Sequence, residues 1–234
     1  MTSITAPEIA EMLGRSGLFG GLPRAVLTAI AGAMRSETYT SGQVIFSRNE
    51  ASGGLYLVTS GRVRLSVTSV EGRELTFRFA ETGDIMGEIA ALDGAKRSAD
   101  AVAAGKVAAL VLSIDVLARL MDQHPVMART ALRFVCERLR ETSNQLEEIA
   151  LYPIERRVAR FLVSALKLGG HDLAAADVPV DLKMNQSELA LLLGASRPKV
   201  NVALGALAQA GAITRKGDAI VCHPVALMRY AGVE

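Results

Sequence analysis

The sequence predicts an α+β protein with an N-terminal β-barrel of jelly-roll type, one long helix, and a C-terminal helical domain with a small hairpin. Three observations predict this order. Short alternating runs of apolar and polar residues with regularly spaced glycines fill 39–112. A heptad repeat follows at 128–149, and two short helical patterns joined at a glycine occupy 185–204. We place the domain boundaries at 1–125, 126–152 and 153–234.

The β-rich segment extends from about Tyr39 to Leu112. Short strands separated by regularly spaced turns are typical of a β-barrel or jelly roll. The preceding segment, Ala6 to Met34, is expected to form short helices around Pro23. The turns are marked by Gly42, Gly53, Gly54, Gly61, Gly72, Gly83, Gly94 and Gly105.

A long helix is predicted from Val126 to Ala150, where residues alternately four and three apart form a seam. A heptad seam of this kind is typical of a helix that pairs with its twin, which favours a homodimer. The alternative is a single amphipathic helix that packs on its own barrel. The seam consists of Ala128, Leu132, Val135, Leu139, Thr142, Leu146 and Ile149.

The long helix should stop before Pro153, because the residue that precedes a proline disfavours helical geometry. We therefore place a hinge at Ala150 to Pro153. A second amphipathic helix is expected from Ile154 to Leu168, ended by two glycines. Residues 171–181 have the pattern of a loop and a strand.

Residues 185–204 have the pattern of a helix-turn-helix. Asn185 is a suitable N-cap with Glu188 three residues later, and Gly194 permits a sharp turn. Ser196 can cap the second helix, in which Pro198 is tolerated near the start. The two helices would be locked together by Leu189, Leu193, Val200 and Leu204.

The outer face of that second helix carries groups suited to base edges and phosphates in a major groove. The alternative is an ordinary helical hairpin with a solvated charged face. Downstream, 212–214 and 219–221 flank 215–218 and predict a hairpin wing, with Lys216 near a phosphate. The expected DNA-binding residues are Gln186, Ser187, Ser196, Arg197, Pro198, Lys199, Asn201 and Lys216.

Composition narrows the class of protein. The net charge is only +2, with −1 over 1–151 and +3 over 152–234. This small basic excess in the second half is only weak evidence for binding to nucleic acid. Cys136 and Cys222 form no cluster with the three histidines, so we expect no metal, haem or iron-sulfur centre. The cysteine usage and the absence of a long apolar run or leader predict a cytoplasmic protein without a membrane segment.

The segment 87–99 combines a glycine, a carboxylate and a guanidinium around a short apolar turn. Glu88 can accept a hydrogen bond from a ribose 2′-hydroxyl, and Arg97 can pair with a phosphate through two N–H groups. Gly87 lets a backbone approach closely, and the following turn can direct N–H groups at an anion. These are the groups that a cyclic nucleotide needs. The alternative is a surface Glu–Arg ion pair beside a β-turn.

These motifs resemble the cAMP receptor protein/fumarate-nitrate regulator (CRP/FNR) superfamily of transcription regulators. The resemblance rests on Gly83-Asp84, Gly87-Glu88 and Arg97-Ser98-Ala99, and it covers nearly the whole chain. Segments 55–65 and 69–75 resemble the strand-turn-strand and central hairpin of that family. The resemblance implies a cyclic-nucleotide-binding domain, a dimerisation helix and a winged helix-turn-helix.

The resemblance also implies an effector, cAMP or possibly cGMP, held by residues from two parts of the chain. Thr142 and Ser143 match a pair on the dimer helix of the family that contacts the purine, although Thr142 alone is also typical of a residue that sets coiled-coil register. The expected effector-binding residues are Gly87, Glu88, Ile89, Ala90, Arg97, Ser98, Thr142 and Ser143.

Two positions depart from the family pattern. A glutamate that follows the recognition-helix arginine is replaced by Pro198, and a later arginine is replaced by Val202. Arg197 matches the arginine that the family has in its recognition helix. The usual half-site of the family is therefore not expected to transfer to this chain.

We expect a homodimeric regulator that binds a cyclic purine nucleotide, then an inverted-repeat promoter site, and acts with RNA polymerase. No Ser/His/Asp or metal-ligand grouping predicts an enzyme. The alternatives are a cGMP receptor, a DNA-binding protein that ignores ligand, and a cyclic-nucleotide phosphodiesterase, which would need metal ligands.

Overall fold

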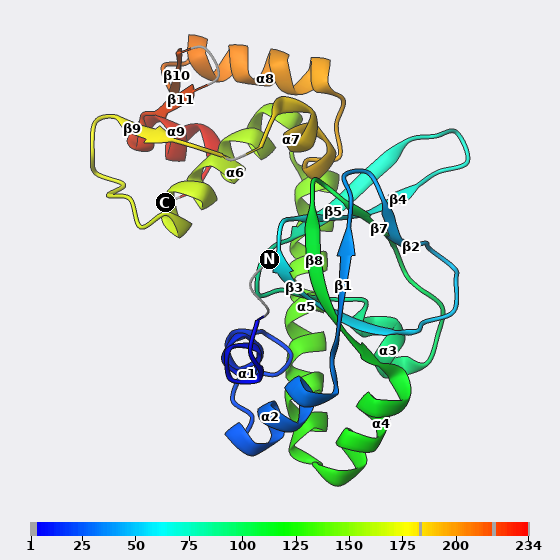
Figure 1. The fold of residues 1–234 in the computed structure, drawn as a ribbon. Helices are drawn as coiled ribbons and strands as arrows, with labels where there is room; N and C mark the ends of the chain where they lie inside the picture. The colour runs from blue at the N-terminus through cyan, green and yellow to red at the C-terminus, as the bar shows by residue number, and fades with distance from the viewer. Residues whose placement is uncertain (1–3, 183, 217–218, 234) are drawn as a thin grey trace. The chain divides into compact units, whose positions relative to one another are not determined.

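The computed structural model describes residues 4–182, 184–216 and 219–233 (Figure 1). The chain divides into two compact units, Met1–Glu141 and Thr142–Glu234. The long helix α5 (Val126–Leu151) contributes to both units, and each unit has its own hydrophobic core.

The first unit begins with two helices, continues with strands, and ends in helices. The predicted short N-terminal helices are confirmed. Its helices besides α5 are α1 (Ala6–Arg15), α2 (Arg24–Ala33), α3 (Glu88–Asp93) and α4 (Ile114–Gln123). Its strands are β1 (Arg35–Tyr39), β2 (Val44–Phe46), β3 (Gly54–Ser60), β4 (Val63–Thr68), β5 (Glu74–Ala80), β6 (Ile85–Met86), β7 (Asp100–Ala103) and β8 (Val107–Ser113).

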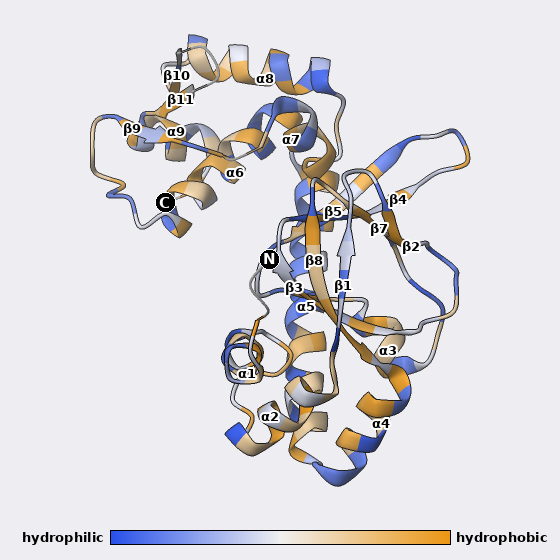
Figure 2. Ribbon diagram, viewed as in Figure 1, coloured by the Kyte–Doolittle hydropathy of each residue, from blue (hydrophilic) through white to orange (hydrophobic). Residues whose placement is uncertain are grey.

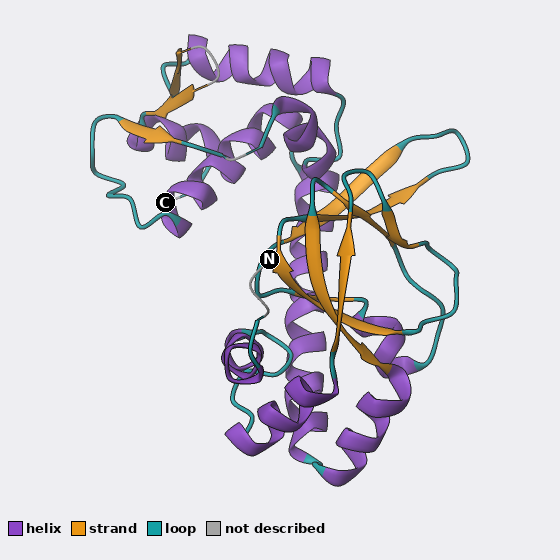
Figure 3. Cartoon of the chain, in the orientation of Figure 1, coloured by secondary structure: helices purple, strands orange, loops and turns teal. Residues whose placement is uncertain are grey.

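The strands of the first unit form two four-stranded antiparallel sheets, drawn in orange in Figure 3. One sheet has the order β1-β8-β3-β6 and the other has the order β2-β7-β4-β5. The predicted jelly roll is confirmed, but the described strands make two sheets rather than one closed ring of hydrogen bonds. The two sheets pack against each other and bury the apolar side chains between them, as a jelly roll requires.

The sheet that contains β3 and β8 is buried on both faces, and β8 is largely orange in the hydropathy colouring of Figure 2. Alternate residues of a strand point to opposite faces. Leu55 and Leu57 pack in a core with helical residues of α1, α2, α4 and α5. Tyr56 and Val58 instead pack with residues of the second sheet. The sheet therefore separates a helical core from a core between the two sheets.

The long helix α5 ends at Leu151, one residue beyond its predicted end, and α6 (Ile154–Leu168) starts after Pro153. The face of α5 that packs in the first unit carries Met127, Ala131 and Phe134. Every residue of the predicted heptad seam lies on a different face and is exposed in the single chain. The seam is therefore not used for packing α5 on its own barrel.

The second unit contains helices α6, α7 (Gln186–Leu192), α8 (Arg197–Gln209) and α9 (Pro224–Ala231). A small antiparallel sheet has the order β10-β11-β9. Its strands are β9 (Val178–Val180), β10 (Ile213–Lys216) and β11 (Ala219–Cys222). The core of the unit is formed mainly by α6 and α8, through Val158, Leu162, Leu166, Val200, Ala203, Leu204 and Leu207.

The wing is a hairpin, as predicted, but its strands lie differently along the sequence. Lys216 pairs with Ala219, so the first strand extends two residues beyond the predicted 212–214. Ala212 precedes the strand and is buried. The predicted turn residues Gly217 and Asp218 lie outside the described residues.

Candidate effector and DNA-binding sites

The Arg97 side chain lies in the interior of the first unit, with only 2% of its surface exposed. Its Nη1 donates to the Gly87 carbonyl oxygen at 2.8 Å, and its Nη2 donates to the Gly54 carbonyl oxygen at 2.7 Å. The guanidinium carbon lies 4.3 Å from the centre of the Phe46 ring and 5.6 Å from that of Tyr56. Two aromatic faces and two carbonyl oxygens thus hold the cation in place.

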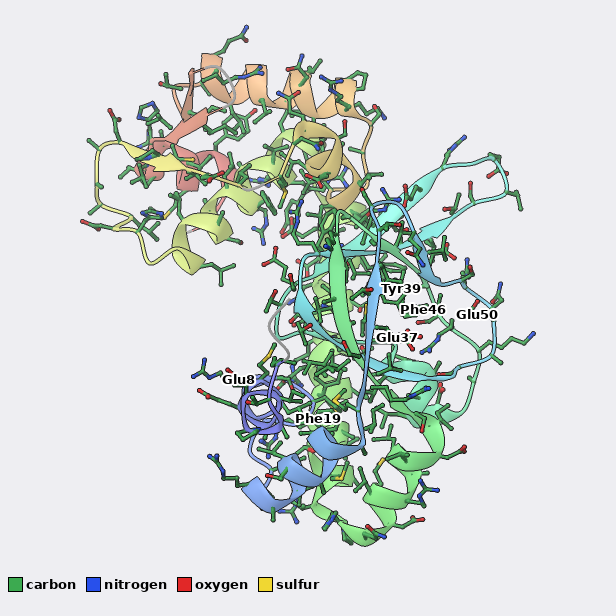
Figure 4. The ribbon with its side chains drawn as sticks, viewed as in Figure 1. Glu8, Phe19, Glu37, Tyr39, Phe46 and Glu50 are labelled. Carbon is green, nitrogen blue, oxygen red and sulfur yellow. The ribbon has the colours of Figure 1, made fainter. Side chains whose placement is uncertain are left out.

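The segment that carries Arg97 is fixed by the loop after β2. Asn49 donates its N–H to the Arg97 carbonyl oxygen at 2.9 Å, and the Arg97 N–H donates to the Glu50 carbonyl oxygen at 3.0 Å. Figure 4 labels Phe46 and Glu50, which belong to β2 and this loop. The loop therefore sets the position of the Arg97 backbone, while Phe46 at the end of β2 lies against its side chain.

Gly87 is required by this geometry for two reasons. Its φ of +74° is in the left-handed region, which disfavours side chains. A Cβ built on Gly87 would lie 2.5 Å from Arg97 Nη1. We expected this glycine to make room for a ligand, but in the structure its missing side chain makes room for the guanidinium.

None of the ion pairs found among the described residues involves Arg97. Its Nε is buried and has no hydrogen-bond partner in the described part of the chain. Burial lowers the pKa of the Arg97 guanidinium, while Tyr56, Glu50 and Glu88 act in the opposite direction. A buried cation is normally paired, so this group is chemically suited to bind an anion.

Three of the other predicted effector residues, Glu88, Ile89 and Ala90, lie in α3. Glu88 is its first residue and is 6% exposed, and Ala90 is also buried. Ile89 and Ser98 are exposed. Thr142 and Ser143 are exposed on the part of α5 that belongs to the second unit. Local geometry thus brings together Gly87, Glu88 and Arg97, while Thr142 and Ser143 belong to a separately described unit.

No sequence motif singles out Arg78, which lies on β5. Its Nη1 donates to Asp84 Oδ2 at 3.2 Å and its Nη2 donates to the Ile85 carbonyl oxygen at 2.7 Å. Burial lowers the pKa of this guanidinium, Arg138 adds to the effect, and Glu88 opposes it. Strand periodicity does not identify this position, because the pairing of β5 with β4 shifts by one residue between Thr76 and Arg78.

The predicted helix-turn-helix is present in the second unit. Asn185 caps α7 by accepting from the N–H groups of Ser187 and Glu188, and Glu188 completes the capping box. Gly194 has a φ of +59°, which permits the turn into α8. Ser196 occupies the N-cap of α8, but its side chain makes no capping hydrogen bond. Both helices therefore start at the predicted residues, but only α7 has a side-chain N-cap.

The exposed part of this motif carries most of the predicted DNA-binding side chains. Gln186 is half-buried, and the backbone of Lys216 ends β10 while its side chain lies outside the described part. Gln186, Arg197, Pro198 and Asn201 line one surface hollow together with Arg215. The remaining exposed residues are Ser187, Ser196 and Lys199.

Arg215 on the wing is a second residue that no sequence motif singles out. Its Nη1 donates to Asn201 Oδ1 at 3.1 Å, across fourteen residues of sequence. This bond occupies one of the two lone pairs of the carboxamide oxygen and does not involve the NH₂ group. The bond therefore fixes the orientation of the Asn201 side chain against the wing.

Comparisons with known proteins match one family model in each of the two units. Residues 36–124 match the family model described as cyclic nucleotide-binding domain, and residues 156–230 match the Crp-like helix-turn-helix domain. A CRP-like cAMP-activated global transcriptional regulator of Mycobacterium tuberculosis is 30% identical over 212 residues, covering 90% of this chain and 94% of that protein. The chain belongs to the CRP/FNR superfamily.

Other CRP/FNR relatives support the same assignment. The cyclic AMP receptor protein of Thermus thermophilus is 30% identical over 213 residues, covering 91% of this chain and 95% of that protein. The crystal structure of the Thermus thermophilus catabolite activator protein has a TM-score of 0.53 at 29% identity, covering 92% of this chain and 98% of that one. This CRP/FNR protein is a CRP-like cyclic-nucleotide-binding transcription regulator.

The described residues of this CRP/FNR protein show no group of three or more His, Cys, Asp or Glu side chains arranged to hold a metal ion. Both cysteines are free thiols. Burial raises the pKa of the Cys222 thiol to about 11, so this thiol stays protonated at neutral pH. Among the described helices, none combines the length and the apolar character needed to cross a membrane.

Proposed function

We propose that the chain is a homodimeric regulator whose affinity for an inverted-repeat DNA site is set by cAMP. The observation that carries the effector part is the buried Arg97, which lacks an ion-pair partner in the described structure and has an unsatisfied Nε. A phosphate would neutralise this cation and accept from its remaining N–H groups. Cytoplasmic location and action through RNA polymerase belong to this proposal.

The effector would be held by groups with different roles. Arg97 and Ser98 bind the cyclic phosphate, and Glu88 accepts from the ribose 2′-hydroxyl, beside Gly87, Ile89 and Ala90. The relatives named cAMP-activated or cyclic AMP receptor support cAMP as the nucleotide. Ribose and phosphate contacts are the same for cGMP, so purine contacts from Thr142 and Ser143 would make the distinction.

The exposed seam of α5 supports a homodimer. Leu132, Leu139 and Leu146 are each about two-thirds exposed in the single chain, whereas the opposite face of the helix packs in its own unit. A stripe of leucines with heptad spacing is stabilised when a twin helix covers it. On an inverted-repeat site, the two α8 helices of such a dimer would enter major grooves about one helical turn apart, at roughly 34–36 Å.

The direct test measures binding of cAMP and cGMP by calorimetry, followed by binding of selected DNA with each nucleotide and without it. We expect cAMP to bind and to raise the affinity for DNA. Stronger activation by cGMP would instead assign a cGMP receptor. DNA binding that is equal with and without nucleotide would assign a regulator that ignores ligand, and consumption of the nucleotide would assign a phosphodiesterase.

Thr142→Ala should weaken the coupling between nucleotide and DNA binding, or change the cAMP/cGMP preference, while the dimer persists. The hydroxyl is proposed to contact the purine and not to hold the helices together. Sedimentation and operator binding with both nucleotides measure the two effects. Asn144→Ala, an exposed position on the same helix, is the control. Unchanged preference and unchanged coupling would reduce Thr142 to a residue that sets register.

Arg197→Ala should weaken operator binding by about 1–3 kcal/mol and relax the preference at one base pair of each half-site. A guanidinium can donate to both O6 and N7 of guanine, which alanine cannot replace. Binding-site selection with the wild type and the variant measures the change. Lys199→Ala is the comparison, because loss of a phosphate contact weakens all sequences alike and lowers the salt slope by about one unit. An unchanged consensus for Arg197→Ala would contradict the assignment.

A further inference from the structure

The outward face of α8 is apolar along its centre. Val200, Ala203 and Leu204 are buried, so a period of 3.6 residues places the opposite ridge at positions 198, 202 and 205. We call Pro198, Val202 and Gly205 the α8 ridge. Val202 is 67% exposed and Pro198 is also exposed. The three residues of this ridge thus offer no hydrogen-bonding side chain, and the exposed Gln209 continues the ridge only in the last turn.

Gly205 gives this ridge a second unusual property. It lies inside α8, where glycine destabilises a helix by about 0.5–1 kcal/mol relative to alanine. A Cβ built on Gly205 would meet nothing within 4 Å outside the backbone of its own helix. Packing within the described chain therefore does not explain the missing side chain. Close approach of another molecule to the backbone would explain it.

The basic residues around the α8 ridge favour an anionic partner. Arg197 and Lys199 flank it in the first turn of α8, where Figure 2 shows hydrophilic colour. Arg215 approaches the same helix through Asn201. The helix contains no acidic residue. A ridge that is apolar at its centre and cationic at its edges is complementary to the floor and the rims of a DNA major groove.

We propose that the α8 ridge reads the 5-methyl group of thymine, with Val202 as the contacting side chain and Gly205 allowing the helix to lie deep in the groove. The inference rests on the proposed DNA-binding function and adds the chemistry of one base position. In the major groove, the thymine methyl is the apolar feature that distinguishes a T·A pair. An isopropyl group can contact it but can donate or accept nothing. Arg197 and Val202 therefore read different bases of each half-site.

The test compares the selected operator with a version in which thymine is replaced by deoxyuracil in each half-site. Deoxyuracil keeps every hydrogen-bonding group and removes only the methyl. The full-length protein with its nucleotide should bind the thymine operator about fourfold more tightly per contacted methyl, and about fifteenfold for two half-sites. Val202→Ala should lose most of this dependence. Val225→Ala, which truncates a valine on α9 that is 57% exposed, should keep it.

Gly205→Ala tests the close approach independently. The variant should melt about 2–4 °C higher, because alanine favours the helix, yet bind the operator more weakly. Unchanged or tighter operator binding would overturn the role of Gly205.

The outcomes separate the two proposals. Tight operator binding that does not depend on the methyl, or a dependence that Val202→Ala retains, overturns methyl reading while DNA binding stands. Failure to select any DNA sequence, with and without nucleotide, overturns the proposed function itself. A ridge that serves a protein partner would leave operator affinity unchanged in Val202→Ala, which also contradicts the inference.

Discussion

Arg97→Leu should weaken cAMP binding by at least tenfold. A charge-assisted pair contributes roughly 1.5–3 kcal/mol, which corresponds to about 10- to 150-fold in affinity. The variant should also unfold more easily, because the carbonyl groups of Gly54 and Gly87 lose their donors and Phe46 loses its cation. Calorimetry and urea unfolding measure the two effects separately on one sample.

Two further variants show whether charge or geometry matters. Arg97→Lys keeps the positive charge but has no planar fork, so its affinity should fall between those of the wild type and Arg97→Leu. Arg62→Leu removes another arginine of the same unit, which lies 5.1 Å from the Phe79 ring, and should leave cAMP affinity within about twofold. A folded Arg97→Leu protein that binds cAMP within about threefold of wild type would show that the effector binds elsewhere.

Leu146→Glu should dissociate the dimer and, with it, high-affinity operator binding. In a paired seam the substitution buries two carboxylates facing each other, at a cost of roughly 3 kcal/mol or more, so the dimer should weaken by about 100-fold or more. Sedimentation as a function of protein concentration measures the dimer. Operator binding at the same concentrations shows the consequence for DNA.

Leu151→Glu is the matched control. Leu151 lies on the same helix, and its exposure in the single chain, 68%, is close to the 66% of Leu146, but it is outside the heptad seam. This control should remain a dimer. If Leu146→Glu sediments as the wild type does, the exposed leucines of α5 are not the dimer interface, and the proposed spacing of the two α8 helices loses its basis.

Local patterns in the sequence were sufficient for most elements. The heptad period predicted α5, and Pro153 predicted its end, because proline constrains the residue before it wherever it occurs. The bounds of α6 agree with the prediction at both ends. Asn185 and Glu188 identified the start of α7, since a capping box uses only neighbouring residues. Each of these signals depends on side chains within a few positions of one another.

Strand β5 shows where local patterns were insufficient. Its alternation places Leu75, Phe77 and Phe79 on one face, which a simple hydrophobic rule would bury. The structure instead buries Thr76 fully and leaves Phe77 partly exposed. The pairing of β5 with β4 also shifts here, from Leu65↔Arg78 to Ser66↔Thr76, so the alternation is interrupted at Phe77. Which face of a strand is buried depends on what packs over it, and a period of two cannot identify that.

The sequence by itself determined which residues could serve a cyclic nucleotide and DNA, because Gly87, Glu88 and the pattern around Arg197 occur in short motifs. Only the tertiary structure decided their environment. Arg97 is held by Phe46 and Gly54, which lie more than forty residues earlier, and Asn201 is engaged by Arg215 of the wing. These contacts join strands and helices that are distant in sequence, so they exist only after sheets and helices have packed, and no local spacing encodes them.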